Sequence, residues 1–328
     1  MTFDKKVNQL SETIYAQLFP IINKNGRENR CVYLDLPYYG NIGDVLIWRG
    51  TEHFLKWAGL KCLYKTSHQA YSEQKMKKIT KRRENPPCKK ILIFLQGGGN
   101  FGDLWERHHN FRKKIIADYP ENKIIILPQT VFYTDSNKMK NDAELFEKHR
   151  SLTICARDEK SFQILKDNFR NEIILVPDMA FCIPQVEIQR YTVPEILGST
   201  LFLKRTDKEI NHTIDCLRYI SQEQFDVQDW ITIDNRYKEE RILLRLSYSK
   251  KIPKFVADLY AQKMFQKTII NEGVRQISKY ENVYTNRLHV AILSILLKKS
   301  FVFFDNSYGK NVDFFKTWLN DLEAVKFI

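Results

Sequence analysis

The sequence predicts an α/β protein with two doubly wound, Rossmann-like domains that face each other across a cleft. Short apolar runs with the composition of buried strands alternate with longer segments of helical periodicity. This pattern is typical of parallel sheets covered by helices on both faces. The alternation lapses between Gln185 and about Gly198, in a polar segment broken by Pro194, and then begins again. We therefore place a first domain at residues 1–190 and a second at residues 191–328.

The first domain opens with an amphipathic helical pattern over Lys5–Ile22, and its first strand is predicted at Cys31–Leu36. Helical periodicity resumes over Val45–Trp57. Four further apolar runs are predicted to be strands: Ile91–Leu95, Ile124–Leu127, Thr153–Ala156 and Ile173–Val176. Ligands of open α/β sheets bind beyond the carboxyl ends of the strands, so the loops that follow these runs form the candidate site.

The second domain repeats the alternation. Five elements are expected in chain order: a strand at Thr200–Leu203, a long helix over Pro253–Ser278, a strand at Asn282–Thr285, a helix at Val290–Leu297 and a strand at Ser300–Phe304. The final segment, Val312–Val325, has helical periodicity, and we expect it to fold back on the first domain.

The composition indicates packed cores rather than disorder, because 43% of the 328 residues are hydrophobic and 13% are aromatic. Asp4, Lys5 and Lys6 interrupt the start of the chain, so no secretory signal is predicted. No apolar run approaches the roughly 20 residues that span a bilayer, and we expect a cytoplasmic protein. The six cysteines are scattered singly, which predicts free thiols.

The chain is basic: lysine and arginine (52) exceed aspartate and glutamate (39) by 13. This excess favours acidic partners, such as nucleic acid, anionic lipid surfaces or phosphorylated small molecules. The densest basic cluster is Lys75–Lys90, and no nucleic-acid motif accompanies it, so we expect no nucleic-acid partner. The cluster suits either a solvated helix face or peripheral contact with an anionic membrane, at the inner face of the plasma membrane.

The most informative short segment is Asn286-Arg287-Leu288-His289, between a predicted strand and a predicted helix. Such a turn leaves backbone N–H groups free and favours an anion. Arg287 adds a planar fork for phosphate or carboxylate, and His289 can exchange a proton near neutral pH. Lys310 places a second cation after the next strand. The alternative explanation is a packing histidine beside a surface arginine.

Two glycine-containing loops follow strands of the first domain: Gly40-Asn41-Ile42-Gly43-Asp44 and Gln96-Gly97-Gly98-Gly99-Asn100. Consecutive glycines either form a tight turn or let the backbone approach a ligand closely. Asp44 is a candidate base or ligand of a sugar hydroxyl, although Asp before a helix is also a favoured N-cap. Neither loop matches the dinucleotide or P-loop pattern.

Arg157 follows the strand Thr153–Ala156, at a helix start where the helix dipole favours an acid. An anionic ligand would explain an arginine at this position, and so would an ion pair of Arg157 with Asp158 or Glu159. Asp178 is expected to be a structural loop residue. No metal site is predicted, because the adjacent His108 and His109 do not converge on one ligand position and no second cluster partners them.

Seven segments carry a resemblance to a known family through their order and spacing: Gly40-Asn41-Ile42-Gly43-Asp44, Gly97-Gly98-Gly99-Asn100-Phe101-Gly102-Asp103, Leu127-Pro128-Gln129-Thr130, Ala156-Arg157-Asp158-Glu159, Pro177-Asp178-Met179-Ala180-Phe181, Arg287-Leu288-His289 and Asp305-Asn306-Ser307-Tyr308-Gly309-Lys310. Over nearly its whole length the chain resembles the polysaccharide pyruvyltransferases, most closely the bacterial exopolysaccharide and capsule branch. The resemblance implies a two-domain fold similar to the GT-B glycosyltransferases. It also implies phosphoenolpyruvate as donor and a pyruvate ketal on a hexose of an exopolysaccharide, capsule or cell-wall precursor as product.

Ketal formation from phosphoenolpyruvate needs an anion clamp, a proton donor for the methylene carbon and a base for the sugar hydroxyl. We assign His289 as the acid, Arg287 and Arg157 with Lys310 as the clamp, and Asp44 as the candidate base. The other predicted substrate contacts are Asn41, Gly43, Gly97, Gly98, Gly99, Asn100, Leu288 and Tyr308. Phosphoenolpyruvate is a co-substrate, so no cofactor is predicted, and basic side chains can neutralise it without a metal.

Two other classes of protein fit the same features. A GT-B-type glycosyltransferase would share the fold but use a nucleotide sugar, and a non-catalytic basic protein would dock on membranes or nucleic acid. The acceptor sugar is either free, polymeric or linked to a lipid. If it is linked to a lipid, attachment of this chain to the membrane would depend on charge.

Overall fold

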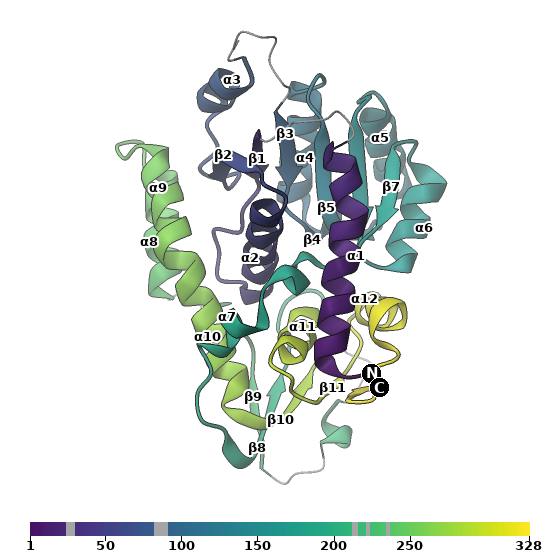
Figure 1. Ribbon diagram of the computed structural model, residues 1–328, viewed down its shortest axis with the longest axis vertical. Helices are drawn as coiled ribbons and strands as arrows, with labels where there is room; N and C mark the ends of the chain where they lie inside the picture. The colour runs from purple at the N-terminus through teal and green to yellow at the C-terminus, as the bar shows by residue number, and fades with distance from the viewer. Residues whose placement is uncertain (24–29, 82–90, 212–215, 221–223, 234–236) are drawn as a thin grey trace.

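The computed structural model describes residues 1–23, 30–81, 91–211, 216–220, 224–233 and 237–328. Two sheets lie one above the other, with helices around them (Figure 1). The seven-stranded sheet has the order β2-β1-β3-β5-β6-β7, with β4 paired to β5, and the five-stranded sheet has the order β12-β11-β10-β8-β9. The described strand pairs are parallel. The predicted α/β class with two Rossmann-like units is confirmed.

The first sheet and its helices come from residues 3–175. The elements are α1 (Phe3–Asn23), β1 (Arg30–Leu34), α2 (Ile42–Trp57), β2 (Lys61–Thr66), α3 (Glu73–Lys81), β3 (Leu92–Leu95), β4 (Gly98–Gly102), α4 (Glu106–Asp118), β5 (Ile124–Phe132), α5 (Ser136–Glu147), β6 (Leu152–Ala156), α6 (Glu159–Asn168) and β7 (Glu172–Leu175). Two of these strands are not predicted from the sequence. β2 is a half-exposed edge strand, and β4 is the glycine segment expected to be a loop.

The second sheet and its helices come from residues 179–327. The elements are the 3₁₀ helix η1 (Met179–Cys182), α7 (Gln185–Gln189), β8 (Ile196–Leu203), η2 (Cys216–Tyr219), β9 (Asp226–Gln228), η3 (Ile231–Ile233), α8 (Lys238–Tyr248), α9 (Lys254–Tyr260), the π-helix η4 (Ala261–Phe265), α10 (Gln266–Ser278), β10 (Tyr280–Thr285), α11 (Leu288–Leu296), β11 (Phe301–Phe303), α12 (Lys310–Phe314), the π-helix η5 (Phe315–Leu319) and β12 (Val325–Phe327). The predicted helix over Val312–Val325 is only partly right, because helical structure ends at Leu319 and Val325 begins an edge strand beside β11.

Alternate residues of the buried strands enter two apolar clusters on opposite faces of the first sheet. In β1, Cys31 and Tyr33 join the larger cluster, whereas Val32 and Leu34 join the smaller one. The larger cluster continues into the second half of the chain, so both sheets share one core. Cys31, Cys62, Cys155 and Cys182 are free, as predicted, and Cys88 lies outside the described residues.

Both ends of the chain tie the halves together. Helix α1 crosses both halves in Figure 1 and contacts η1 and α11. The amino group of Met1 donates a hydrogen bond to the Asp321 carbonyl at 2.9 Å. The segment after β11 contacts the first half, as expected: Nε1 of Trp318 donates to the carbonyl of Arg157 at 2.7 Å.

No helix in the described ranges is long and apolar enough to cross a membrane. Residues 82–90 of the basic cluster at Lys75–Lys90 lie outside these ranges. Within them, Lys77 forms an ion pair with Glu73, and Nζ of Lys75 lies 4.1 Å from the ring centre of Tyr64. Part of the charge of this cluster therefore already has a partner inside the protein.

Candidate functional site

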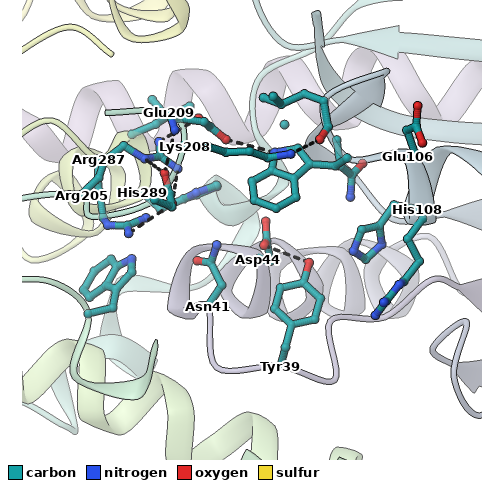
Figure 2. A pocket seen from close by; sticks show the side chains of 18 of the residues that line it. Tyr39, Asn41, Asp44, Glu106, His108, Arg205, Lys208, Glu209, Arg287 and His289 are labelled. Carbon is teal, nitrogen blue, oxygen red and sulfur yellow. Dashed lines mark hydrogen bonds and ion pairs between the residues drawn. The ribbon is translucent and has the colours of Figure 1, made fainter. Parts of the chain in front are cut away.

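A cavity of about 680 Å³ lies between the two halves, beyond the carboxyl ends of strands from both sheets. Its walls include Tyr39 after β1, Arg157 after β6, Arg205 after β8 and Arg287 after β10. Figure 2 shows Arg205, Arg287 and His289 gathered at one end, with His108 at the other. The cavity thus occupies the position expected for ligands of open α/β sheets.

Most of the predicted site residues line this cavity: Asn41, Asp44, Gly99, Asn100, Arg157, Arg287, Leu288, His289 and Lys310. Gly43, Gly97, Gly98 and Tyr308 do not.

Gly97, Gly98 and Tyr308 have structural roles beside the cavity, and their predicted contacts with a substrate stay predictions. A Cβ on Gly97 would lie 2.8 Å from the Pro128 carbonyl oxygen, and Gly98 has a φ of +133°, so backbone packing and turn geometry require these two glycines. Tyr308 supports the wall from behind, because its hydroxyl donates to Glu209 at 3.1 Å.

His289, the second residue of α11, projects from the second half against the first turn of α2. A Cβ on Gly43 would lie 2.4 Å from Nδ1 of His289, so Gly43 leaves the room that the ring needs. Nε2 of His289 lies 3.3 Å from Oδ2 of Asp178 but makes no hydrogen bond to a described residue. Burial would raise the pKa of Asp178, but His289 and Arg157 lower it to about 2. Asp178 is therefore an anion beside the predicted acid, rather than only a loop residue.

Arg157 is almost fully buried in the cavity wall. Its Nη1 donates to Oδ2 of Asp178 at 2.8 Å, so its ion pair is not with either of its neighbours in sequence. Its Nη2 faces Gly99: a Cβ on Gly99 would lie 3.2 Å from Nη2 and 3.6 Å from Nζ of Lys310. The glycine therefore keeps a small space open in front of two cations.

Glu209 is a buried carboxylate that organises the cations of the second half. Its Oε2 accepts a hydrogen bond from Nζ of Lys310 and lies 2.9 Å from Nη1 of Arg205, and Nε1 of Trp105 from the first half donates to Oε1 at 3.2 Å. Burial lowers the pKa of Lys310 to about 8, although Glu209 opposes this shift. Lys310 is therefore a cation whose charge can be removed at mildly alkaline pH.

Arg287 is the N-cap residue of α11, and a carboxylate of the protein already occupies its fork. Nε and Nη2 donate to the two oxygens of Asp229 at 2.5 and 2.6 Å, and Nη2 lies 3.4 Å from Asp207. The remaining nitrogen, Nη1, makes no hydrogen bond within the described parts of the chain. An anionic ligand would therefore meet Nη1 or displace Asp229.

The first turn of α2 places Asn41 and Asp44 in the cavity wall. The side chain of Asn41 accepts from the Gly43 N–H at 3.0 Å, so the N-cap role considered for Asp44 belongs to Asn41, and the helix begins three residues earlier than predicted. Oδ2 of Asp44 accepts from the hydroxyl of Tyr39 at 3.0 Å (Figure 2). Because Asp44 does not cap the helix, its carboxylate can act as a base or as a ligand of a sugar hydroxyl.

Asp35, His68 and His108 form a cluster beside the end of the cavity that lies away from Arg287. Nδ1 of each imidazole lies 3.0 Å from Oδ1 of Asp35, and both histidines line the cavity. The three groups have the spacing of metal ligands, which corrects the prediction that no cluster partners His108. Residues far apart in sequence converge here, so spacing along the chain could not reveal the cluster. Hydrogen bonds alone satisfy Asp35, and the geometry does not require an ion.

Other cavity residues are not predicted from the sequence. Arg205, Lys208 and Glu209 follow β8, so the rule of strand ends could have found them. Glu240 carries no such signal, because it comes from α8 and reaches the first half, where its Oε2 accepts from the N–H of Gly40 at 3.0 Å.

Comparisons with known proteins give the family and the fold of this chain. A family model described as "Polysaccharide pyruvyl transferase" matches residues 41–308. The chain is 32% identical to "Putative pyruvyl transferase EpsO" of Bacillus subtilis, over 99% of this chain and 96% of that protein. It is 26% identical to "Pyruvyl transferase 1" of Schizosaccharomyces pombe, over 94% of this chain and 73% of that one. The crystal structure of an uncharacterised protein, KP1_0663 of Klebsiella pneumoniae, has the same fold, with a TM-score of 0.60 at 19% identity over 96% of this chain and 98% of the other.

Proposed function

The chain belongs to the polysaccharide pyruvyl transferase family, and we propose that phosphoenolpyruvate is its pyruvyl donor. The proposed acceptor is a hexose of an exopolysaccharide, capsule or cell-wall precursor. Two of its hydroxyls form a ketal with the central carbon of pyruvate, and phosphate is released. We place the reaction in the cytoplasm and assign it no cofactor.

One observation carries the proposal: the cavity has two chemically different ends (Figure 2). Arg157, Arg287 and Lys310 lie with His289 at one end, which suits a small anion that must receive a proton. From Asp44 and Tyr39 in the middle to His108 at the other end, the wall presents carboxylate, phenol and imidazole groups, which suit the hydroxyls of a sugar. A donor with a phosphate and a carboxylate would lie at the first end, and its acceptor at the second.

We assign different roles toward the donor to the residues of the cationic end. Nη2 of Arg157 and Nζ of Lys310 face the space kept open by Gly99, and we assign them to the phosphate or carboxylate. Nη1 of Arg287 reaches the same anion from the second half. His289 delivers a proton from its imidazole to the methylene carbon, while anionic Asp178 faces the ring.

Two groups can accept the hydroxyl protons: Asp44 in the middle of the cavity and His108 at its other end (Figure 2). Asp44 is held by Tyr39, and His108 is oriented by Asp35 through Nδ1, which leaves Nε2 as a possible base. We keep Asp44 as the first candidate, because it lies on the same turn of α2 that contacts His289.

The proposed reaction consumes two hydroxyl protons and releases one phosphate. His289 protonates the methylene carbon to a methyl group, and the central carbon becomes electrophilic. A first sugar hydroxyl adds to that carbon and loses its proton to the base. The bond to the phosphate oxygen then breaks, and the second hydroxyl adds with loss of its proton. One proton returns to His289, and the other leaves with phosphate.

The test is phosphate release from phosphoenolpyruvate in the presence of a panel of glycosides, with sugar nucleotides assayed in parallel. We expect phosphate release to depend on both phosphoenolpyruvate and a glycoside, to survive chelation, and to give a product heavier by one ketal-linked pyruvate in mass spectrometry. His289→Gln should abolish the reaction, because a positioned proton donor is worth about 10²–10⁴-fold in rate.

His53→Gln is the matched control, since His53 pairs with Glu187 and does not line the cavity. Transfer from a sugar nucleotide, with phosphoenolpyruvate inert, would replace this proposal with the glycosyltransferase alternative. Equal activity of the His289→Gln protein and the His53→Gln protein would remove His289 from the mechanism.

A further inference from the structure

The paired helices α8 and α9 carry a row of exposed apolar side chains that nothing in the described structure covers. Tyr248, Phe255, Leu259 and Met264 have exposed fractions of 58%, 58%, 54% and 57%. Phe255 and Leu259 are four residues apart and share one face of α9. Met264 follows in the π-helix η4, where a turn takes about one residue more, so it continues that face.

Lysines flank and interrupt this row in the sequence. Between residues 248 and 267 the chain has five lysines, at positions 250, 251, 254, 263 and 267, and one acid, Asp258. Asp258 is buried and accepts hydrogen bonds from Tyr38 and Thr66 of the first half, at 2.9 and 2.7 Å. The outer surface of this segment is therefore apolar and cationic, which is the composition of helices that lie in the interface of anionic membranes.

The helix pair is fixed by one face and open on the other. Asp258 anchors α9 to the first half, and just beyond η4 the first residue of α10, Gln266, donates from Nε2 to Glu52 of α2 at 3.1 Å. In Figure 1 the pair runs along one edge of the molecule, and the turn between α8 and α9 projects away from both sheets. A rigid inner face and a projecting outer face allow the surface to touch a bilayer without a change in the core.

The same helix pair borders the cavity. Leu244 and Tyr248 of α8 line its wall, and Tyr248 is also the first member of the exposed row. The apolar surface therefore begins at the cavity and extends outward along α9.

We propose that the outer face of α8, α9 and η4, defined by Tyr248, Phe255, Leu259 and Met264 with the five lysines, docks on an anionic lipid bilayer. Docked in this way, the cavity opens next to the membrane, where a sugar on a lipid carrier is held. Binding of the bilayer stands on the surface alone, whereas the lipid-linked acceptor rests on the proposed function. We propose this surface in addition to Lys75–Lys90, whose contact with a membrane stays a prediction.

The experiment is co-sedimentation of the full chain with vesicles of phosphatidylcholine containing phosphatidylglycerol, and with vesicles of phosphatidylcholine alone. We expect binding to the anionic vesicles at low salt and release at high salt, because charge attraction fades within about 10 Å at 0.1 M salt. Lys250→Glu with Lys251→Glu should weaken the partition coefficient by on the order of tenfold or more. Phe255→Asn with Leu259→Asn should also release the protein, without changing its charge.

Two matched controls separate this surface from others. Val186→Asn with Leu197→Asn removes two apolar residues that are exposed elsewhere, and should leave vesicle binding unchanged. Lys77→Glu with Lys78→Glu changes two exposed lysines of α3, and should have less effect than the reversal at Lys250 and Lys251. The proposal is overturned if the wild-type chain does not bind anionic vesicles, or if the α3 pair has the larger effect.

A second copy of the chain is the competing occupant, and light scattering tests it. A wild-type dimer that becomes monomeric in the Phe255→Asn, Leu259→Asn protein would assign the face to self-association and overturn the proposal. Activity on a small soluble glycoside keeps this test separate from the proposed function. The helix-pair variants should retain that activity and lose only vesicle binding and turnover of a membrane-held acceptor, whereas failure of the proposed function would abolish glycoside activity in the wild type as well.

Discussion

At the scale of single residues, Gly43 of the first half leaves the space that the ring of His289 from the second half occupies. A Cβ at position 43 would overlap the imidazole, with 2.4 Å to Nδ1 and 2.7 Å to Cβ of His289, so the ring could not stay in place. Gly43→Ala should therefore lower kcat by about 10²-fold, close to the loss of the proton donor itself. Overpacking should also lower the free energy of unfolding by about 1–3 kcal/mol.

The double variant Gly43→Ala, His289→Ala distinguishes crowding from other effects at position 43. Removing the ring should restore stability, because alanine is otherwise well accepted inside a helix, but it should not restore activity. Chemical denaturation of the single and double variants measures this. A double variant as unstable as Gly43→Ala would show that the glycine serves the backbone rather than the histidine.

Lys310 gives the site a pH dependence with a defined direction. Its pKa is lowered to about 8 by burial, so the side chain is charged below that pH and loses its proton as the pH rises through it. We expect kcat/KM for phosphoenolpyruvate to fall on the alkaline side with an apparent pKa near this value. In the Lys310→Arg protein, kcat/KM should not fall over this alkaline pH range, since arginine stays charged. An alkaline limb that persists unchanged in the arginine variant would assign it to another group.

The individual residues show what a sequence can and cannot predict about a site. Arg287, His289, Arg157 and Lys310 are found because each follows a buried strand, and that position alone brings them together. The carboxylates that hold them, Asp178, Glu209 and Asp229, are not predicted in this role. Which acid meets which base depends on side-chain directions at the strand ends, and these are set by packing rather than by local sequence.

At the scale of elements, the segment of α12 and η5 is attached to the donor end of the cavity. Nε1 of Trp318 donates to the carbonyl of Arg157, and the N–H of Glu159 donates to the hydroxyl of Thr317 at 3.1 Å, so η5 holds the start of α6 in place. Trp318→Phe removes the first bond and should lower stability by about 1 kcal/mol. Because Arg157 is then less well positioned, KM for phosphoenolpyruvate should rise several-fold with kcat little changed. Trp57→Phe, at an exposed tryptophan, is the control.

The interior strands of the first sheet are predicted from the sequence, and so is its edge strand β7. β1, β3, β5 and β6 lie in the interior of a parallel sheet, and each contains an apolar run that is recognisable in the sequence. β2 and β12 are edge strands with lysines and exposed positions, so their sequences lack this signal. β4 consists largely of glycine, and only its pairing with β5 makes it a strand.

At the scale of the whole molecule, the division along the chain is not the division in space. The strands of the two sheets separate cleanly in sequence, yet α9 and α10 of the second half pack on the first, where Gly273 brings its backbone against Ile42 of α2. The larger apolar cluster takes in Trp48 from the first half and Ile292 from the second. The helices between the sheets therefore belong to both.

This shared core predicts how the protein unfolds. Because neither half can lose its structure without exposing the same cluster, differential scanning calorimetry should show one transition, with a calorimetric enthalpy close to the van't Hoff enthalpy. A fragment of residues 1–190 should lack a cooperative transition of its own, since it loses the partners of α1 and α2 in α10 and α11. Two domains with separate hydrophobic cores would instead give two transitions, and the fragment of residues 1–190 would unfold cooperatively by itself. Observing either of these would show that the contacts between α2, α10 and α11 are a closed state of a hinge rather than a permanent core.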